Sequence, residues 1–393
     1  MTIIARNLVG PLLRAAGHYP VATVTGPRQS GKTTLCRATF PEHAYVSLEP
    51  LDTRAFATTD PRAFLGAHAG GAILDEIQNV PSLPSYIQSM VDDDPTPGRF
   101  ILTGSQHLGL STAVSQSLAG RTAILHLWPL GYDEVLRFPT PPNRLWDAVW
   151  QGGYPRIHDQ GIPADDWLAN YATTYLERDV RTVLEVANLT AFSSFLRLAA
   201  ASTAQALNLS ALGADAGVSH NTARSWLSVL ETTFVCQRLS AWHRNARKRL
   251  VKSPKLHFVD SGLACHLLGI QSAAQLEHHP LRGALFETWV AGEVAKARIH
   301  RGLRADLFHY RETRGIEVDL VVEAADRIIL VEVKSGATVA SDWLAPLARL
   351  RDEMVAAGEQ RAIELRVLYG GDEARQQLGV KVVPWWGVAA ERW

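Results

Sequence analysis

Residues 21–35, VATVTGPRQSGKTTL, decide the fold of the first third of this chain. They predict a buried strand over residues 21–24, a tight loop, and a helix that begins at Lys32. The loop, residues 26–33, fits the phosphate-binding pattern G-x-x-x-x-G-K-[ST]. Its two glycines let successive N–H groups point at one anion, and the free N–H groups of the helix point the same way. The stretch therefore predicts a nucleoside-triphosphate site.

Each polar residue of this loop has an expected role toward ATP and Mg²⁺, the predicted cofactors. Lys32 would reach the β- and γ-phosphates, and the Thr33 hydroxyl would bind Mg²⁺. The alternative is a glycine-rich turn before an ordinary helix. The predicted nucleotide contacts are Gly26, Pro27, Arg28, Gln29, Ser30, Gly31, Lys32, Thr33, Thr34 and Thr103.

Two acids follow the small apolar run of residues 71–74. A buried parallel strand that ends in carboxylates is what a P-loop enzyme needs beside its loop. Asp75 would hold Mg²⁺ through water, and Glu76 would polarise the attacking water.

Two further residues of this region have open assignments. Thr103 ends the predicted strand 99–103, where it would sense the γ-phosphate or simply begin a β-turn. Arg121 would neutralise charge on its own or a neighbouring chain's nucleotide, or would be a surface arginine.

These segments resemble a known family. GPRQSGKTTL, ILDEIQ, ILTGSQ, Leu118-Ala-Gly-Arg121, Gly152-Gly-Tyr-Pro155 and Tyr175-Leu-Glu-Arg-Asp-Val180 are similar to prokaryotic AAA-type ATPases that carry a C-terminal domain of unknown function. That family is related to the archaeal-type ATPases of the AAA+/STAND group. The resemblance implies a RecA/AAA-like αβα core and, as in many relatives, a nucleotide-dependent homo-oligomer.

The whole chain has the composition of a globular protein. Its 393 residues allow two or three domains, with 47% apolar and 20% charged residues. Lys and Arg number 39 and Asp and Glu also 39, so any nucleic-acid surface must be local. The three cysteines show no metal spacing, which fits a reducing compartment. With no apolar run of about 20 residues, we expect a cytoplasmic protein without membrane contact.

The middle of the chain predicts a winged helix. Residues 209–230 read as helix, turn and helix, with Ser210 and Ser219 as caps and Gly217 in the turn. His220, Asn221, Thr222 and Arg224 would be exposed at the start of the second helix, where they could reach bases or phosphates. A strand at residues 234–239 and a basic wing would follow, the wing formed by Arg244, Arg247, Lys248, Arg249, Lys252 and Lys255. The alternative is a packing lid over the nucleotide.

The sequence of the last third predicts a β-hairpin that carries three acidic residues and a lysine. A helix over residues 281–297 precedes strands at 306–310, 316–322 and 328–333. A symmetric turn at residues 325–326 would place Asp319 opposite Glu332, and Glu317 opposite Lys334. Mg²⁺ between the two facing carboxylates would remove their repulsion.

This D…E-x-K pattern resembles the restriction-endonuclease-like family. The resemblance implies that Asp319 and Glu332 hold Mg²⁺, that Lys334 orients water or stabilises the phosphorane, and that Glu287 is the supporting glutamate. The proline that often precedes the aspartate is replaced by Val318. The alternative is a surface hairpin with a Glu317–Lys334 ion pair.

We therefore expect an α/β protein in four parts: a P-loop ATPase core (1–140), a helical connector (141–200), a winged helix (201–278) and a nuclease-like domain (279–393). The expected function is ATP hydrolysis coupled to Mg²⁺-dependent action on nucleic acid, with DNA as the expected partner of the winged helix and the C-terminal domain. Two other functions fit the same sequence: an ATP-switched DNA-binding regulator, and a protein-interaction ATPase, both with an inactive nuclease-like domain.

Overall fold

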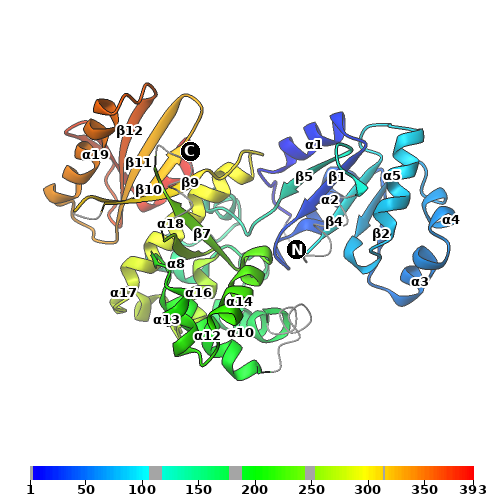
Figure 1. Ribbon diagram of the computed structural model, residues 1–393, viewed down its shortest axis with the longest axis horizontal. Coiled ribbons are helices and arrows are strands. Elements are labelled where there is room, and N and C mark those ends of the chain that lie inside the picture. Colours follow the sequence, from blue (N-terminus) through cyan, green and yellow to red (C-terminus); the bar gives the residue numbers. More distant parts are fainter. Residues whose placement is uncertain (1–2, 106–116, 177–187, 244–252, 313–314) are drawn as a thin grey trace. The chain divides into compact units, whose positions relative to one another are not determined.

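The computed structural model describes residues 3–105, 117–176, 188–243, 253–312 and 315–393. The predicted basic wing, apart from Lys255, and residues 177–180 of the Tyr175–Val180 segment lie outside this part. The chain forms two compact units. Unit 1 contains Met1–Pro129, Thr232–Phe234 and Arg298–Leu303, and unit 2 contains the remainder. Each unit is described by itself (Figure 1).

Unit 1 is built on a five-stranded parallel sheet (Figure 1). Every neighbouring pair of strands in it is parallel. The predicted strand that leads into the phosphate-binding loop, β1, lies inside the sheet, between β4 and β5. The order across the sheet is β2 (Ala44–Ser47), β3 (Ala72–Asp75), β4 (Phe100–Gly104), β1 (Val21–Thr25) and β5 (Thr122–His126).

Alternate residues of these strands pack on opposite faces of the sheet. On one face, Ala22, Ile73 and Ile101 pack with helices α1 (Val9–His18) and α2 (Lys32–Thr39). On the other face, the neighbouring residues Val21, Leu74, Phe100 and Leu102 pack with α3 (Leu51–Thr59), α4 (Pro61–Gly66) and α5 (Leu83–Asp93). This confirms the predicted core of helix, parallel sheet and helix, since strands buried on both faces form only between two helical layers.

The pattern of residues 3–16 predicts an amphipathic helix with Leu8, Leu12 and Leu13 on one side, but the first helix runs from Val9 to His18. Leu8 and Leu12 are fully buried, whereas Leu13 is 49% exposed. One side of the helix contacts the sheet, and position 13, next to Leu12, points away from it.

The helical part of unit 2 contains the predicted helix-turn-helix. Gly217 makes the turn with a φ of 71°, and the Ser219 hydroxyl accepts a hydrogen bond from the Thr222 N–H at 3.1 Å. The first cap was predicted wrongly: Asn208 caps α13, and Ser210 lies inside that helix. Among the described residues, this part contains α7 (Tyr132–Val135), α8 (Leu145–Gln151), α9 (Pro155–Gln160), α10 (Ala164–Tyr171), α12 (Leu189–Ala201), α13 (Leu209–Asp215), α14 (His220–Thr232), α16 (Ser261–Leu267), α17 (Ala273–His278) and α18 (Arg282–Ile299).

A nine-stranded sheet joins the two segments that the sequence assigned to a winged helix and a nuclease-like domain. The connection is made by β7 and β9, which pair in parallel at Ser240–Phe308 and Ala241–His309. The predicted boundary at residue 278 therefore separates elements that share one sheet. The order is β13 (Arg375–Gln377), β14 (Val380–Pro384), β12 (Ala362–Tyr369), β11 (Arg327–Lys334), β10 (Glu317–Glu323), β9 (Leu307–Arg311), β7 (Cys236–Ala241), β8 (Lys255–Phe258) and β6 (Gln205–Ala206).

Helix α19 (Ala345–Ala356) covers part of this sheet with Leu347, Leu350 and Met354. These side chains pack against strand residues that include Leu330 and Val367. The pattern of residues 362–369 predicts a strand, and β12 has these bounds. The short strands β13 and β14 were not predicted.

The Gly152-Gly-Tyr-Pro155 segment has a packing role. Gly152 has a φ of +66°, and a Cβ atom there would lie 2.3 Å from Asp260 Oδ1. The Gly153 N–H donates to Asp260 Oδ2 at 2.7 Å, and Asp260 Oδ1 accepts from the Leu263 N–H at 3.0 Å to cap α16. The two glycines thus let one buried carboxylate join α8 to α16. No helix in the described part of the chain is long and apolar enough to span a membrane.

Candidate functional sites

The phosphate-binding loop has the backbone geometry that its glycines predicted. Gly26 and Gly31 have φ values of 154° and 94°, and Gln29, between them, has 61°. A Cβ atom at Gly26 would lie 2.1 Å from the Leu127 carbonyl oxygen, so only glycine fits there. Residues 26–33 therefore form the sharply turned loop that precedes the N-terminus of α2.

Lys32 is the buried cation of this loop. Its Nζ donates to the carbonyl oxygens of Gly26 at 3.1 Å and Pro27 at 2.8 Å. Burial lowers the pKa of Lys32, and the negative charges of Glu76 and Asp75 partly oppose this. The ammonium group thus binds the inside of the loop, where it was predicted to meet phosphate.

Asp75 lies at the end of β3, at the centre of a group of hydroxyls. Its carboxylate accepts from the Thr33 hydroxyl at 3.0 and 3.1 Å, from the Tyr45 hydroxyl at 2.8 Å, and from the Thr103 hydroxyl. Hydroxyl and carboxylate oxygens are the ligands that Mg²⁺ prefers. The residues present therefore fit a Mg²⁺ site formed by Thr33 and Asp75. The structure also places Thr103 beside them.

Glu76 follows Asp75 in a left-handed backbone conformation, with φ 58° and ψ 48°. Few residues other than glycine adopt these angles, and such strain is concentrated at functional sites. Its carboxylate accepts from the Gln78 side-chain amide, which also lies 3.3 Å from the Ser105 hydroxyl. Gln78 and Ser105 come from the ILDEIQ and ILTGSQ segments, so the structure brings these two segments together.

Two residues that contact this site were not predicted from the sequence. Tyr45, on β2, has a pKa raised to about 12 by burial and by its hydrogen bond to Asp75. Arg6 donates to the carbonyl oxygens of Ser30 at 2.8 Å and Trp128 at 2.9 Å, which ties the loop to the segment after β5. The Tyr45 position could have been noticed because it lies on the strand beside the predicted acids. No local sequence pattern indicates the role of Arg6.

Arg121 lies directly before β5 and forms a two-pronged ion pair with the exposed Asp92 of the same unit. This contact does not distinguish between its two assignments, and the charge-neutralising role stays a prediction.

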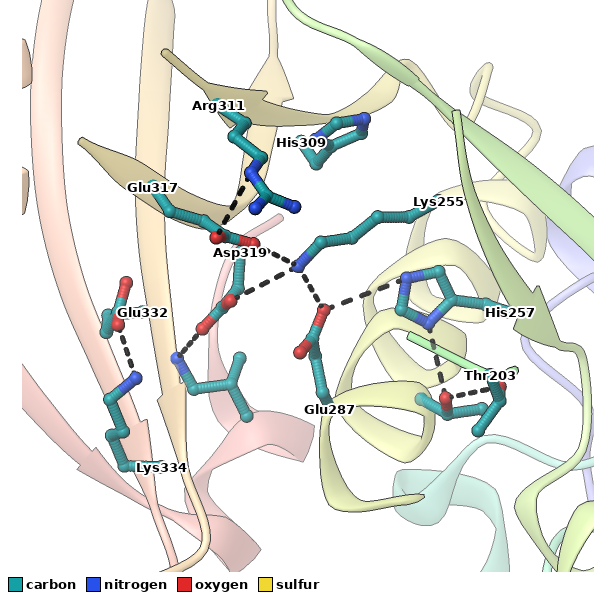
Figure 2. A network of polar contacts seen from close by, with 12 residues as sticks. Thr203, Lys255, His257, Glu287, His309, Arg311, Glu317, Asp319, Glu332 and Lys334 are labelled. Atoms are coloured by element: carbon teal, nitrogen blue, oxygen red, sulfur yellow. Dashed lines mark hydrogen bonds and ion pairs between the residues drawn. The ribbon is translucent and has the colours of Figure 1, made fainter. Parts of the chain in front are cut away.

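In unit 2, the predicted acids surround a lysine (Figure 2). Lys255 Nζ lies 3.0 Å from Glu287 Oε1, 3.1 Å from Glu317 Oε1 and 3.4 Å from Asp319 Oδ1. Lys255 is only 4% exposed. Its assignment to an exposed wing was therefore wrong. β8 lies inside the nine-stranded sheet, which turns this side chain toward α18 and β10. We call Lys255, Glu287, Glu317 and Asp319 the Lys255 cluster.

Glu332 and Lys334 form a separate ion pair. Lys334 Nζ lies 2.5 Å from Glu332 Oε1. In Figure 2 this pair lies beside the Lys255 cluster. The alternative Glu317–Lys334 ion pair is not found, because Glu317 contacts Lys255 and Arg311 instead.

The β10–β11 register agrees with the prediction where the two strands pair. The predicted register is confirmed over four pairs, from Leu320–Val331 to Glu323–Ile328. Asp319 lies outside the paired residues of this ladder, and the pairing of β10 with β9 is irregular between Val318 and Val321. Its Oδ2 accepts from the backbone N–H of Val333 at 2.9 Å.

The predicted Mg²⁺ ligands Glu287, Asp319 and Glu332 therefore do not fit a metal ion in the arrangement described. Asp319 and Glu287 contact Lys255, and Glu332 contacts Lys334. Over the described ranges, no three His, Cys, Asp or Glu side chains are placed to hold a metal ion. Each of these acids instead contacts a lysine.

Burial shifts the pKa values in this region strongly. Burial, and then the charge of Asp319, raise the pKa of Glu287 to about 8 and that of Glu332 to about 7. Burial alone would lower the pKa of Lys255, but the charges of Glu287 and Asp319 hold it above its ordinary value. Burial and the positive charge of Lys255 lower the pKa of His257 to about 3, so this imidazole is neutral.

Comparisons with known proteins agree with the N-terminal site. Residues 18–136 match an AAA domain, residues 142–274 match a domain of unknown function (DUF8612), and residues 282–387 match another (DUF4143). Two uncharacterized mycobacterial proteins, Rv2008c of Mycobacterium tuberculosis and Mb2031c of Mycobacterium bovis, are each 32% identical over 86% of this chain and 75% of their own length. The chain belongs to their family. Its AAA domain makes it an ATPase.

More distant similarities extend beyond the mycobacteria. An uncharacterized protein of Haemophilus influenzae is 22% identical over 66% of this chain and 64% of its own length. Among solved structures, the Walker-type ATPase PABY2304 of Pyrococcus abyssi is 16% identical, with a TM-score of 0.46, over 67% of this chain and 96% of its own. The STAND protein PH0952 of Pyrococcus horikoshii, which has a tetratricopeptide repeat sensor, is 10% identical, with a TM-score of 0.26, over 75% and 48%.

Proposed function

We propose that this ATPase is a nucleotide-controlled switch that binds DNA through the helix-turn-helix of unit 2. The observation that carries the proposal is the two-sided character of α14. Ala223, Trp226, Leu227 and Leu230 are buried, whereas His220, Asn221 and Arg224 are exposed at its first turns. Polar and basic side chains at the start of a recognition helix can reach base edges and phosphates.

In the nucleotide site, each residue has a role toward ATP. The loop N–H groups and Lys32 would hold the phosphates, and Thr33 and Asp75 would hold Mg²⁺, which supplies charge neutralisation when bound. Thr103, whose hydroxyl donates to Asp75, would sense the γ-phosphate. Glu76 would orient the attacking water after it leaves the Gln78 amide. If the chain assembles into a homo-oligomer, Arg121 would leave Asp92 and reach a neighbour's nucleotide.

The catalytic assignment is tested by two substitutions. Lys32→Ala should abolish ATP binding, because the loop loses its only lysine. Glu76→Gln should keep ATP binding and lower turnover by about 10²–10⁴-fold, since the residue acts on water alone. Binding is measured with a fluorescent ATP analogue and turnover by phosphate release. Glu49→Gln, at an exposed acid near β2, is the control. Unchanged turnover in Glu76→Gln would refute the assignment.

DNA binding is tested by fluorescence anisotropy of duplex DNA at several salt concentrations. A steep fall in affinity with salt is expected, because phosphate contacts release counterions. If the protein does not bind DNA even at low salt, the alternative function of an ATPase that binds a partner protein is favoured.

A second candidate function is Mg²⁺-dependent cleavage of nucleic acid by the C-terminal acids. The observation that favours it is Glu332 Oε2, which is buried and has no hydrogen-bond partner among the described residues. Cleavage would require that Asp319 and Glu332 leave their lysines and share one ion. Mg²⁺-dependent cleavage that disappears in both Asp319→Ala and Lys334→Ala would establish it. If DNA and RNA stay intact without nucleotide, with ADP and with ATP, cleavage is excluded and the DNA-binding switch remains the proposed function.

A further inference from the structure

Tyr45 connects the edge strand of the unit 1 sheet to the acid at the end of β3. It lies in register with Ile73 of β3, and Asp75 follows Ile73 by two residues. Side chains two residues apart in a strand point to the same side of a sheet, so these three residues share one side. Ile73 packs with α2 on that side. The Tyr45 hydroxyl therefore meets Asp75 on the side of the helix that carries Thr33, and it donates to Asp75 Oδ2 at 2.8 Å.

A cation from α2 orients the ring of this tyrosine. The guanidinium carbon of Arg37 lies 4.7 Å from the centroid of the Tyr45 ring. Arg37 follows Thr33 by about one helical turn, so both residues lie on the same side of α2. A guanidinium group over an aromatic face attracts the ring electrostatically. Tyr45 is thus held at its ring by Arg37 and at its hydroxyl by Asp75, although it is 39% exposed.

The Tyr45 contact differs from the two threonine contacts of Asp75. Thr33 and Thr103 also donate to this carboxylate. Both threonines have a proposed role toward the nucleotide, Thr33 as a ligand of Mg²⁺ and Thr103 as a sensor of the γ-phosphate. Tyr45 has no such role, so its hydrogen bond can stay in every nucleotide state. Hydrogen bonds of this kind orient the carboxylates of metal sites, and their loss typically lowers metal affinity by about 10–100-fold.

We propose that Tyr45 is a positioning residue of the ATPase site. Its hydroxyl holds Asp75 Oδ2 in the orientation that receives the Mg²⁺–ATP complex, and Arg37 holds its ring. Tyr45 acts on the nucleotide only through Asp75. The inference rests on the proposed role of Asp75 toward Mg²⁺ and is independent of DNA binding. It adds a residue of β2 to the site, from a strand that the phosphate-binding pattern does not include.

The first test measures the affinity for a fluorescent, non-hydrolysable ATP analogue, with Mg²⁺ and with a chelator. Tyr45→Phe keeps the ring that Arg37 contacts and removes the hydroxyl. It should lower the affinity for the Mg²⁺ complex about tenfold, the low end of the usual range, because Asp75 is expected to hold the ion through water. The affinity measured with chelator should not change. Equal affinities of Tyr45→Phe and the native protein for the Mg²⁺ complex would overturn the proposal.

Turnover separates positioning from a loss of folded protein. In Tyr45→Phe, KM for the Mg²⁺–ATP complex should rise about tenfold while kcat stays within about twofold, because a saturating complex fills the weakened site. A lower kcat with an unchanged KM would indicate a smaller folded fraction and would contradict the positioning role. Tyr19→Phe is the matched control and should change neither constant. Tyr19 is 40% exposed and precedes β1, at the end of that strand opposite the loop.

Asp75→Asn separates a failure of this inference from a failure of the proposed nucleotide site. This variant should weaken binding of the Mg²⁺ complex, and adding Tyr45→Phe to it should cause no further loss, because the tyrosine acts through this carboxylate. A further tenfold loss in the double variant would place the action of Tyr45 elsewhere. If Asp75→Asn binds the Mg²⁺ complex with native affinity, the proposed Mg²⁺ role of Asp75 is wrong and this inference falls with it. If only Tyr45→Phe has native affinity, the role of Asp75 stands and this inference alone is wrong.

Discussion

At the scale of single residues, backbone conformation decides which positions tolerate a side chain. Gly152 and Gly161 both have positive φ values, 66° and 61°. A Cβ atom at Gly152 would meet the Asp260 carboxylate at 2.3 Å, whereas at Gly161 it would meet nothing within 4 Å. Asp260 cannot move cheaply, because it binds the N–H groups of Gly153 and Leu263.

We therefore expect Gly152→Ala to destabilise unit 2 by about 3 kcal/mol or more, from backbone strain and the clash together. Gly161→Ala should cost only about 1 kcal/mol, from strain alone. Both are measured by denaturant unfolding followed by tryptophan fluorescence. Equal losses in the two variants would show that the contact with Asp260 is not what requires glycine at position 152.

The raised pKa of Glu287 predicts a pH dependence of stability. Its pKa is about 8 in the folded chain and 4.5 ordinarily, so the folded state holds a proton that the unfolded state has lost between these values. Stability from this group is thus present at low pH and is lost as the pH rises toward 8.

Between pH 5 and pH 8, the melting temperature of the native protein should fall by a few degrees more than that of Glu287→Gln, which cannot ionise. The lowered pKa of His257 acts in the opposite direction below pH 6.5, but it is present in both proteins. Differential scanning calorimetry in chelator-containing buffer measures the difference. If the melting temperatures of the native protein and Glu287→Gln change with pH to the same extent, the pKa of Glu287 is not raised in the folded chain.

At the scale of elements, one tryptophan fixes the helix-turn-helix. Trp226 of α14 packs edge-on against Phe192 and Phe195 of α12, with ring centroids 5.3 and 5.4 Å apart. It is 5% exposed, so its burial and aromatic contacts orient α14 and hold the polar start of that helix outward.

Trp226→Ala should destabilise the protein by about 3–5 kcal/mol, because it leaves a large cavity between the two helices. Trp386→Ala is the matched control: this tryptophan is 45% exposed, and its loss should cost less than about 1 kcal/mol. Thermal unfolding by circular dichroism measures both. A mild loss in Trp226→Ala would mean that α14 is held by other contacts.

At the scale of the whole molecule, the proposed switch requires coupling between the nucleotide and DNA. A non-hydrolysable ATP analogue should change DNA affinity by about 5–150-fold relative to ADP, and DNA should change the affinity for that analogue by the same factor. Anisotropy titrations in each nucleotide state measure both. If DNA affinity is the same with the ATP analogue and with ADP, nucleotide and DNA binding are not coupled, and the proposed switch is wrong.

The same titrations test where DNA binds. Arg224→Ala should weaken binding across sequences and reduce the salt slope by about 1, because one phosphate contact is lost. Arg349→Ala removes a similarly exposed arginine from α19 and should change neither. If Arg224→Ala binds DNA with native affinity and salt dependence, DNA does not bind at the start of α14.

The sequence alone determined the features whose physics is local. The loop of residues 26–33, the acids after β3, the Ser219 cap, the inward face of α14 and the β10–β11 register all follow from glycine geometry, capping and periodicity within short segments. The AAA domain match agrees with the first of these predictions.

Only the tertiary structure decided the partners of buried charges. Lys255 is separated by 32 and 64 residues from Glu287 and Asp319, and Arg6 by 24 from Ser30. A local pattern could assign Lys255 to a wing but not to a sheet interior, because its neighbours depend on the pairing of β7 with β9. That pairing is set by burial across the whole unit.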